Sequence, residues 1–170
     1  PRHTLSIHDA LPIYYLLVIT ARGQLYWLKV HQIPPASRTS RGKPVVNLLN
    51  IEKDEQIASI VRVREFPEDQ HLFFATRNGL VKKTSLAAYS NVRTVGINAI
   101  NIVEGDRLID VQLTSGDDDV LLATRLGKSI RFAESDARVM GRATRGVRGI
   151  NLAKGDAVVG LVVDRRDASV

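Results

Sequence analysis

Three segments of the chain combine arginine or lysine with glycine, serine or threonine, the residue types that bind phosphate groups. The guanidinium fork of arginine matches two phosphate oxygens, hydroxyl groups donate hydrogen bonds, and glycine lets the backbone come close to a ligand. We call these segments the first, second and third basic loops, and they are residues 38–43, 91–96 and 140–149. Their recurrence predicts a surface that binds a polyanion through several phosphate contacts.

Catalytic and metal-binding patterns are weaker. Residues 127–129 read Gly-Lys-Ser, but a phosphate-binding loop needs a glycine five residues earlier, where this chain has Leu122, and no helix is expected to follow. No set of nucleophile, base and acid has the spacing of a catalytic site. The histidines have no metal-ligand spacing, and they are His3, His8, His31 and His71. The sequence therefore favours binding over catalysis.

The composition agrees with a globular, basic protein. Of 170 residues, 44% are hydrophobic, the formal net charge is +6, and there is no cysteine. The charge favours a polyanionic partner, and the lack of cysteine fits a reducing compartment. Aromatic residues make up 5%, which is too few for a platform that stacks the bases of a single strand.

The basic loops lie between repeated hairpins. An apolar run ending in Thr-x-x-Gly occurs three times, at residues 16–23, 72–79 and 120–127. An apolar segment leads to an acidic turn after each basic loop, at residues 52–54, 104–106 and 154–156. The aspartates there could ligate a cation, but we expect them to bond the backbone of their own turns. A period of about fifty residues is typical of propeller-like blades.

Strand patterns dominate each unit, with two strands in the hairpin and two around the acidic turn. We expect single helical turns at most, at residues 85–89 and 134–136. The predicted units are residues 14–64, 65–114 and 115–170, all within one domain. Residues 1–13 match nothing in the later units, so we expect them to be foreign to the domain or disordered. The apolar stretch 13–21 is too short to span a bilayer, which needs about 20 residues.

Five segments of the chain resemble the C-terminal domain of the DNA gyrase A subunit. They are residues 29–34, 41–49, 78–84, 113–116 and 140–150, and the similarity extends over residues 14–170. The resemblance implies an all-β β-pinwheel of four-stranded antiparallel blades, about three of which are present. A hairpin reaching over to complete a neighbouring blade is part of the implied fold.

The resemblance also implies a function. The basic perimeter of such a domain wraps duplex DNA, and the whole enzyme, an ATP-dependent type II topoisomerase, then introduces negative supercoils. The cleaving tyrosine, ATP and magnesium belong to other regions, so no catalytic residue, metal or cofactor is expected in this chain. The implied partners are double-stranded DNA and the remaining gyrase A and gyrase B subunits of an A2B2 assembly, in the bacterial cytoplasm at the nucleoid. The arginine-rich box of the family's first blade is missing here.

Twelve residues are the predicted phosphate contacts, namely Arg38, Arg41, Lys43, Lys82, Lys83, Arg93, Arg125, Lys128, Arg131, Arg142, Arg145 and Arg148. Two other interpretations stay open. The first is the pinwheel of the topoisomerase IV A subunit, and the second is a propeller-like protein-interaction module without a nucleic-acid role. A continuous positive surface would exclude the second.

Overall fold

The computed structural model describes residues 14–35, 37–39, 41–42, 44, 47–91 and 95–165. The predicted contacts Lys43 and Arg93, and the expectation for residues 1–13, lie outside these ranges. The strands are β1 (Tyr15–Thr20), β2 (Gln24–Lys29), β3 (Ile57–Val63), β4 (His71–Thr76), β5 (Leu80–Ser85), β6 (Ile97–Asn98), β7 (Leu108–Thr114), β8 (Asp119–Thr124), β9 (Ser129–Ala133), β10 (Val147–Arg148) and β11 (Val158–Asp164). The predicted all-β class is confirmed.

Short 3₁₀ turns are the other regular elements of the described residues. They span Val30–Gln32, Leu86–Tyr89 and Glu134–Asp136. The second and third confirm the single turns predicted at the ends of two hairpins, and the first was not predicted. None of the described elements is a helix long and apolar enough to cross a membrane.

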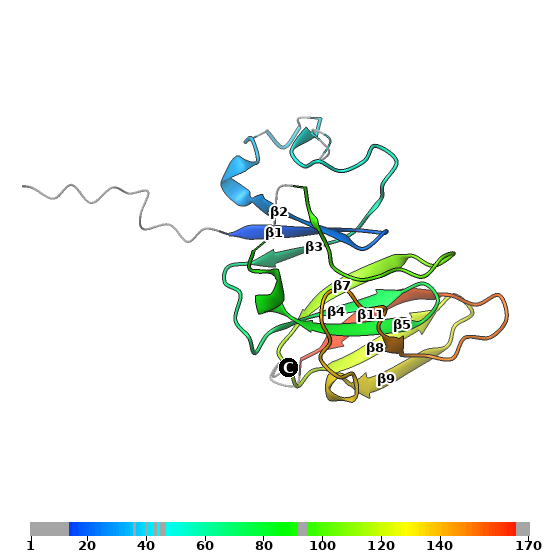
Figure 1. The fold of residues 1–170 in the computed structure, drawn as a ribbon. Coiled ribbons are helices and arrows are strands. Elements are labelled where there is room, and N and C mark those ends of the chain that lie inside the picture. The colour runs from blue at the N-terminus through cyan, green and yellow to red at the C-terminus, as the bar shows by residue number, and fades with distance from the viewer. Residues whose placement is uncertain are drawn as a thin grey trace, which may run out of the picture.

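The strands form three antiparallel sheets that stack on one another (Figure 1). Their strand orders are β3-β1-β2-β6 in sheet 1, β10-β5-β4-β7 in sheet 2 and β11-β8-β9 in sheet 3. Two edge strands come from the unit that follows in the sequence: Ile97–Asn98 pairs with β2, and Val147–Arg148 pairs with β5. Exchange of a segment with a neighbouring blade, which the resemblance implies, is therefore present in sheets 1 and 2. Sheet 3 has three strands among the described residues, one fewer than the four expected of a blade.

Apolar layers lie between the sheets. Phe74 packs with Leu17 and Ile19 between sheets 1 and 2, whereas Phe73 packs with Val120 and other residues between sheets 2 and 3. Both rings are fully buried. Successive strand residues point to opposite faces, so these adjacent phenylalanines on β4 hold the middle sheet to both neighbours.

A buried threonine closes each hairpin turn. The Oγ1 atoms of Thr20, Thr76 and Thr124 each accept a hydrogen bond from the backbone N–H four residues later, at 3.1 Å in all three turns. The carbonyl oxygens of the same threonines accept from the glycine N–H groups three residues later. The repeated threonine and glycine are therefore the structural signature of the turn.

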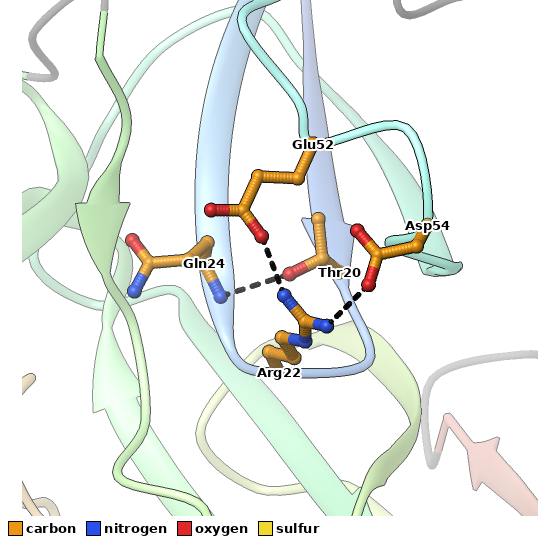
Figure 2. Close-up of polar contacts among 5 residues, drawn as sticks. All are labelled: Thr20, Arg22, Gln24, Glu52 and Asp54. Atoms are coloured by element: carbon orange, nitrogen blue, oxygen red, sulfur yellow. Dashed lines mark hydrogen bonds and ion pairs between the residues drawn. The ribbon is translucent and has the colours of Figure 1, made fainter.

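The acidic turns dock on the hairpin turns. In sheet 1 the Arg22 guanidinium contacts Glu52 at 2.6 Å and Asp54 at 2.8 Å (Figure 2). In the later units a backbone N–H of the hairpin donates to an aspartate side chain: Asn78 N donates to Asp106 Oδ1 at 2.9 Å, and Leu126 N donates to Asp156 Oδ1 at 3.0 Å.

Each of the two later aspartates also accepts from the backbone N–H of the next residue, Arg107 or Ala157, at 2.8 Å. The expectation that the acidic residues form turns is confirmed for Asp106 and Asp156. No group of three or more acidic or histidine side chains among the described residues has the arrangement of a metal site.

The charge of Asp156 should stabilise the fold. Burial acts to raise its pKa, but hydrogen bonds from Thr124, Leu126 and Ala157 and the charge of Arg125 outweigh burial and lower the pKa below 3.8. Because the folded pKa is depressed, this stabilisation is present above the unfolded pKa and is lost as the pH falls through the folded one.

We therefore expect Asp156→Asn, which keeps the acceptor oxygen but not the charge, to lower the free energy of unfolding at neutral pH. Urea unfolding at a series of pH values measures the difference. It should shrink once the pH falls below 3.8, the ordinary value for this carboxyl. A difference that stays constant into the acid range would contradict the role of the charge.

Two hairpin glycines allow the cost of a positive φ to be separated from the cost of a steric clash. Gly79 and Gly127 have positive φ angles of 84° and 78°. A Cβ added to Gly79 would lie 2.9 Å from the Ile150 carbonyl oxygen, whereas a Cβ added to Gly127 would meet no atom within 4 Å beyond its chain neighbours. Gly127→Ala should cost about 1 kcal/mol for the left-handed backbone alone. Gly79→Ala should cost at least twice that in urea unfolding, because the new methyl group would also clash with Ile150. Equal costs for the two variants would show that the segment around Ile150 moves aside without a cost in stability.

Candidate nucleic-acid interface

The third basic loop runs along the outer edge of sheet 2. Val139 forms a parallel bridge with Lys83, and the Met140 N–H donates to the Lys83 carbonyl oxygen at 2.8 Å. Residues 147–148 then pair with β5 as β10. Gly146, at φ +93°, lies so close to β5 that a Cβ would collide with the Val81 backbone. The loop is therefore fixed at both ends to the same strand.

The tip of this loop is held by donors from the second unit. The Arg142 carbonyl oxygen accepts from Lys82 Nζ, the Ala143 carbonyl from Asn101 Nδ2 at 3.1 Å, and the Thr144 carbonyl from Asn101 N at 2.9 Å. Three successive carbonyl groups thus point into the protein. The side chains of Arg142, Arg145 and Arg148 are exposed, so the loop presents its charges to solvent on a constrained backbone.

The second and third basic loops meet in a groove of about 560 Å³. Ser90, Asn91, Gly96 and Asn98 line it from the second unit, and Arg142 and Ala143 line it from the third. Ala88, Val95 and Ile97 make the rest of the lining largely apolar, so the Arg142 guanidinium is the group there that suits an anionic ligand. The groove joins the basic loops of two units into one surface.

The second basic loop leads to an edge strand of sheet 1, in the same way that the third basic loop contributes an edge strand to sheet 2. Its last residues form β6 on the edge of β2, and a Cβ on Gly96 would collide with the Tyr26 ring. Basic loops of successive units therefore occupy equivalent edges of successive sheets. This equivalence is seen for the second and third loops, and the recurrence of the first loop at such a position stays a prediction.

Several predicted contacts are exposed but differ in their partners. Arg38 and Arg41 of the first loop are exposed, as are Arg125 and Lys128 of the third hairpin. The Arg125 guanidinium, however, donates to the Gly155 carbonyl oxygen. The prediction for these residues remains untested.

Arg131 is already neutralised by two carboxylates. Its guanidinium lies 2.7 Å from an Asp119 oxygen and 3.2 Å from an Asp164 oxygen on the outward face of sheet 3. A phosphate would have to displace these partners, so we expect Arg131 to contribute less to binding than the loop arginines do.

Lys82 and Lys83 are wrongly predicted as phosphate contacts. Lys82 is fully buried and Lys83 is 5% exposed. Lys82 Nζ donates to the Ala99 carbonyl oxygen at 2.6 Å, and Lys83 Nζ donates to that of Glu134 at 2.9 Å. A lysine pair in a strand indicates exposed charge, but alternate residues of β5 face the two apolar layers, so both side chains point inward.

The sequence analysis did not identify two kinds of residue at this surface, further exposed arginines and a residue that supports the third loop. Arg77, Arg107 and Arg138 are exposed arginines near the hairpins and the third loop, and Arg138 could have been found by its proximity to that loop. Asn101 supports the loop tip through a contact between segments 42 residues apart, and no local pattern signals such a contact.

The model of the family described as DNA gyrase C-terminal domain, beta-propeller, matches residues 14–64, 70–115 and 118–163. The DNA gyrase A subunit of Salmonella typhimurium is 49% identical over 165 residues, which cover 97% of this chain and 18% of that protein. The DNA gyrase A subunit of Escherichia coli K12 is 50% identical over 156 residues, covering 92% of this chain and 18% of that protein. The chain thus spans about a fifth of the length of these relatives.

Solved structures give the same fold. The C-terminal domain of a DNA topoisomerase IV matches with a TM-score of 0.80 at 32% identity, over 88% of this chain and 47% of that one. A DNA gyrase A C-terminal domain matches with a TM-score of 0.73 at 21% identity, over 91% and 49%. The stacked sheets with exchanged edge strands, and the match to all three units, place this chain in the DNA gyrase C-terminal domain family.

Proposed function

We propose that this chain binds duplex DNA by phosphate contacts from its basic loops and acts as the C-terminal DNA-wrapping domain of a DNA gyrase A subunit. The observation that carries the proposal is the continuous surface where the second and third loops meet, with Arg142, Arg145 and Arg148 exposed on a fixed backbone. Contacts to phosphates carry no sequence information, so the binding should tolerate any sequence.

The proposal extends to the whole protein. In an A2B2 assembly with the rest of the gyrase A polypeptide and with gyrase B, the wrapped segment would be presented for strand passage, giving negative supercoils at the expense of ATP. The ATP and magnesium sites would lie in those other parts, and this chain would need no cofactor. Its location would be the bacterial cytoplasm, at the nucleoid.

A geometric argument supports wrapping. Duplex DNA has a persistence length of about 50 nm, so a tight bend must be held by many contacts along a curved surface. Equivalent basic loops on successive sheets supply contacts at repeated positions.

The triple change of Arg142, Arg145 and Arg148 to Glu should greatly weaken duplex binding and reduce its salt dependence. Each lost phosphate contact should lower the slope of log affinity against log salt by about 0.9. A salt-titrated binding assay on linear duplex measures both quantities.

The control is the triple change of Lys53, Arg64 and Lys154 to Glu, which alters net charge equally at other exposed positions. Equal losses in the two variants would indicate a general charge effect. An affinity unmoved by salt or by the loop variant would contradict phosphate contacts by these arginines.

A topology assay tests wrapping itself. Nicked circular duplex sealed by ligase in the presence of the chain should show a shift in linking number of one sign, because a wrap of fixed hand is trapped on sealing. The loop variant should give none at the same concentration. Tight binding of the unmodified chain without any such shift would show that it binds but does not wrap.

The topoisomerase IV interpretation has one observation in its favour, the TM-score of 0.80 with that enzyme's C-terminal domain. The sequence identities of 49% and 50% are with gyrase subunits, and we therefore prefer gyrase. Supercoiling of relaxed circles by the assembled enzyme separates the two, since relaxation alone would favour topoisomerase IV.

A further inference from the structure

We propose that Lys82 is a positioning residue that holds the tip of the third basic loop against the second unit, and so sets the affinity of that loop for DNA phosphates. The inference rests on the proposed DNA binding and assigns a role to a buried side chain that cannot reach DNA itself. Through its hydrogen bonds to the Ala99 and Arg142 carbonyl oxygens, Lys82 connects the second unit to the third basic loop.

The contacts of Lys82 join three parts of the chain. From β5, its ammonium donates to the Ala99 carbonyl oxygen, just after β6 has paired with sheet 1, and to the Arg142 carbonyl oxygen at the loop tip. Nζ also lies 5.5 Å from the centre of the Phe74 ring. A single charged group therefore ties the middle sheet to both the exchanged strand and the third loop.

Burial of this ammonium is unfavourable for stability. Burial, with the charge of Arg142 acting in the same direction, lowers the pKa of Lys82 from 10.5 to about 8. Between these values the unfolded state binds more protons than the folded state, so this group makes the fold more stable as the pH rises. The charged form at neutral pH thus carries a desolvation cost, which its hydrogen bonds to the Ala99 and Arg142 carbonyl oxygens offset.

The groups around Lys82 do not titrate in the same range. Burial raises the pKa of Tyr89, which donates to the same Ala99 carbonyl oxygen at 3.2 Å. A change in loop behaviour around the pKa of Lys82 can therefore be assigned to Lys82.

Lys82→Met tests the role, because methionine is an unbranched side chain only one heavy atom shorter and lacks the donor. We expect duplex affinity near neutral pH to fall about tenfold, the order expected when one or two phosphate contacts are lost. Thermal stability should fall modestly, because the Arg142 carbonyl oxygen loses this donor. Lys154→Met removes the same charge from an exposed position and should leave the affinity close to that of the unmodified chain.

A second variant keeps the net charge. Asn101→Ala removes the side-chain donor to the Ala143 carbonyl and should also weaken binding, by severalfold. If Lys82→Met failed to fold, the Asn101→Ala variant would still test whether anchoring the loop tip sets the affinity for DNA. Amide exchange of Asn101, whose N–H donates to the Thr144 carbonyl, should be faster in the Lys82→Met variant without DNA, which reports loop anchoring directly.

The pH profile gives an independent signature. A neutral amine donates weaker hydrogen bonds than an ammonium does. Affinity of the unmodified chain should therefore fall more steeply between about pH 7 and about pH 9, across the Lys82 pKa of about 8, than the affinity of Lys82→Met does. Lys154→Met should follow the unmodified chain.

Normal binding, slow Asn101 exchange and an unchanged pH profile in the Lys82→Met variant would overturn the inference. Failure of the unmodified chain to bind duplex would instead overturn the proposed function, and Asn101 exchange would still test the anchoring of the loop.

Discussion

The rest of the structure depends on one constraint: a sheet edge left open by one unit is closed by two residues of the next. Ile97–Asn98 pairs with β2, and Val147–Arg148 pairs with β5. An unpaired edge exposes backbone donors and acceptors that must find partners. Since the closing strand directly follows the second basic loop and lies within the third, pairing it also fixes where each of these loops lies. The same hydrogen bonds that complete the fold therefore align the charged loops on successive sheets.

The crossing segments impose close contacts that explain why glycine stands at two of the hairpins. The backbone after each exchanged strand passes over the preceding hairpin, where the Ala99 N–H donates to the Gly23 carbonyl and the Gly149 N–H donates to that of Gly79, both at 2.8 Å. Glycine is required at these hairpins for its positive φ and for the lack of a Cβ in the path of the crossing chain. Gly127 needs only the positive φ, because no described segment crosses it.

Charge in this molecule serves two separate purposes. Lys82 and Lys83, on opposite faces of β5, direct their ammonium groups to backbone carbonyls within the apolar layers, where a charged hydrogen bond is strong but costly to desolvate. Arg142, Arg145 and Arg148 lie on the surface. Arg22 and Arg131 are exposed yet paired with carboxylates. The net charge alone does not reveal this division, which follows from the direction of each side chain.

Local sequence was enough to determine the all-β class, the threonine and glycine hairpins, the acidic turns and the two short 3₁₀ turns, because each depends on residues close together in the chain. It also indicated the third basic loop, whose residue types carry their chemistry wherever they are placed. Tertiary structure decided which sheet each short strand completes, the burial of Lys82 and Lys83, and the support of the loop tip by Asn101. Those outcomes depend on pairing between units and on which face of a strand meets a neighbour, and neither is encoded within a single repeat.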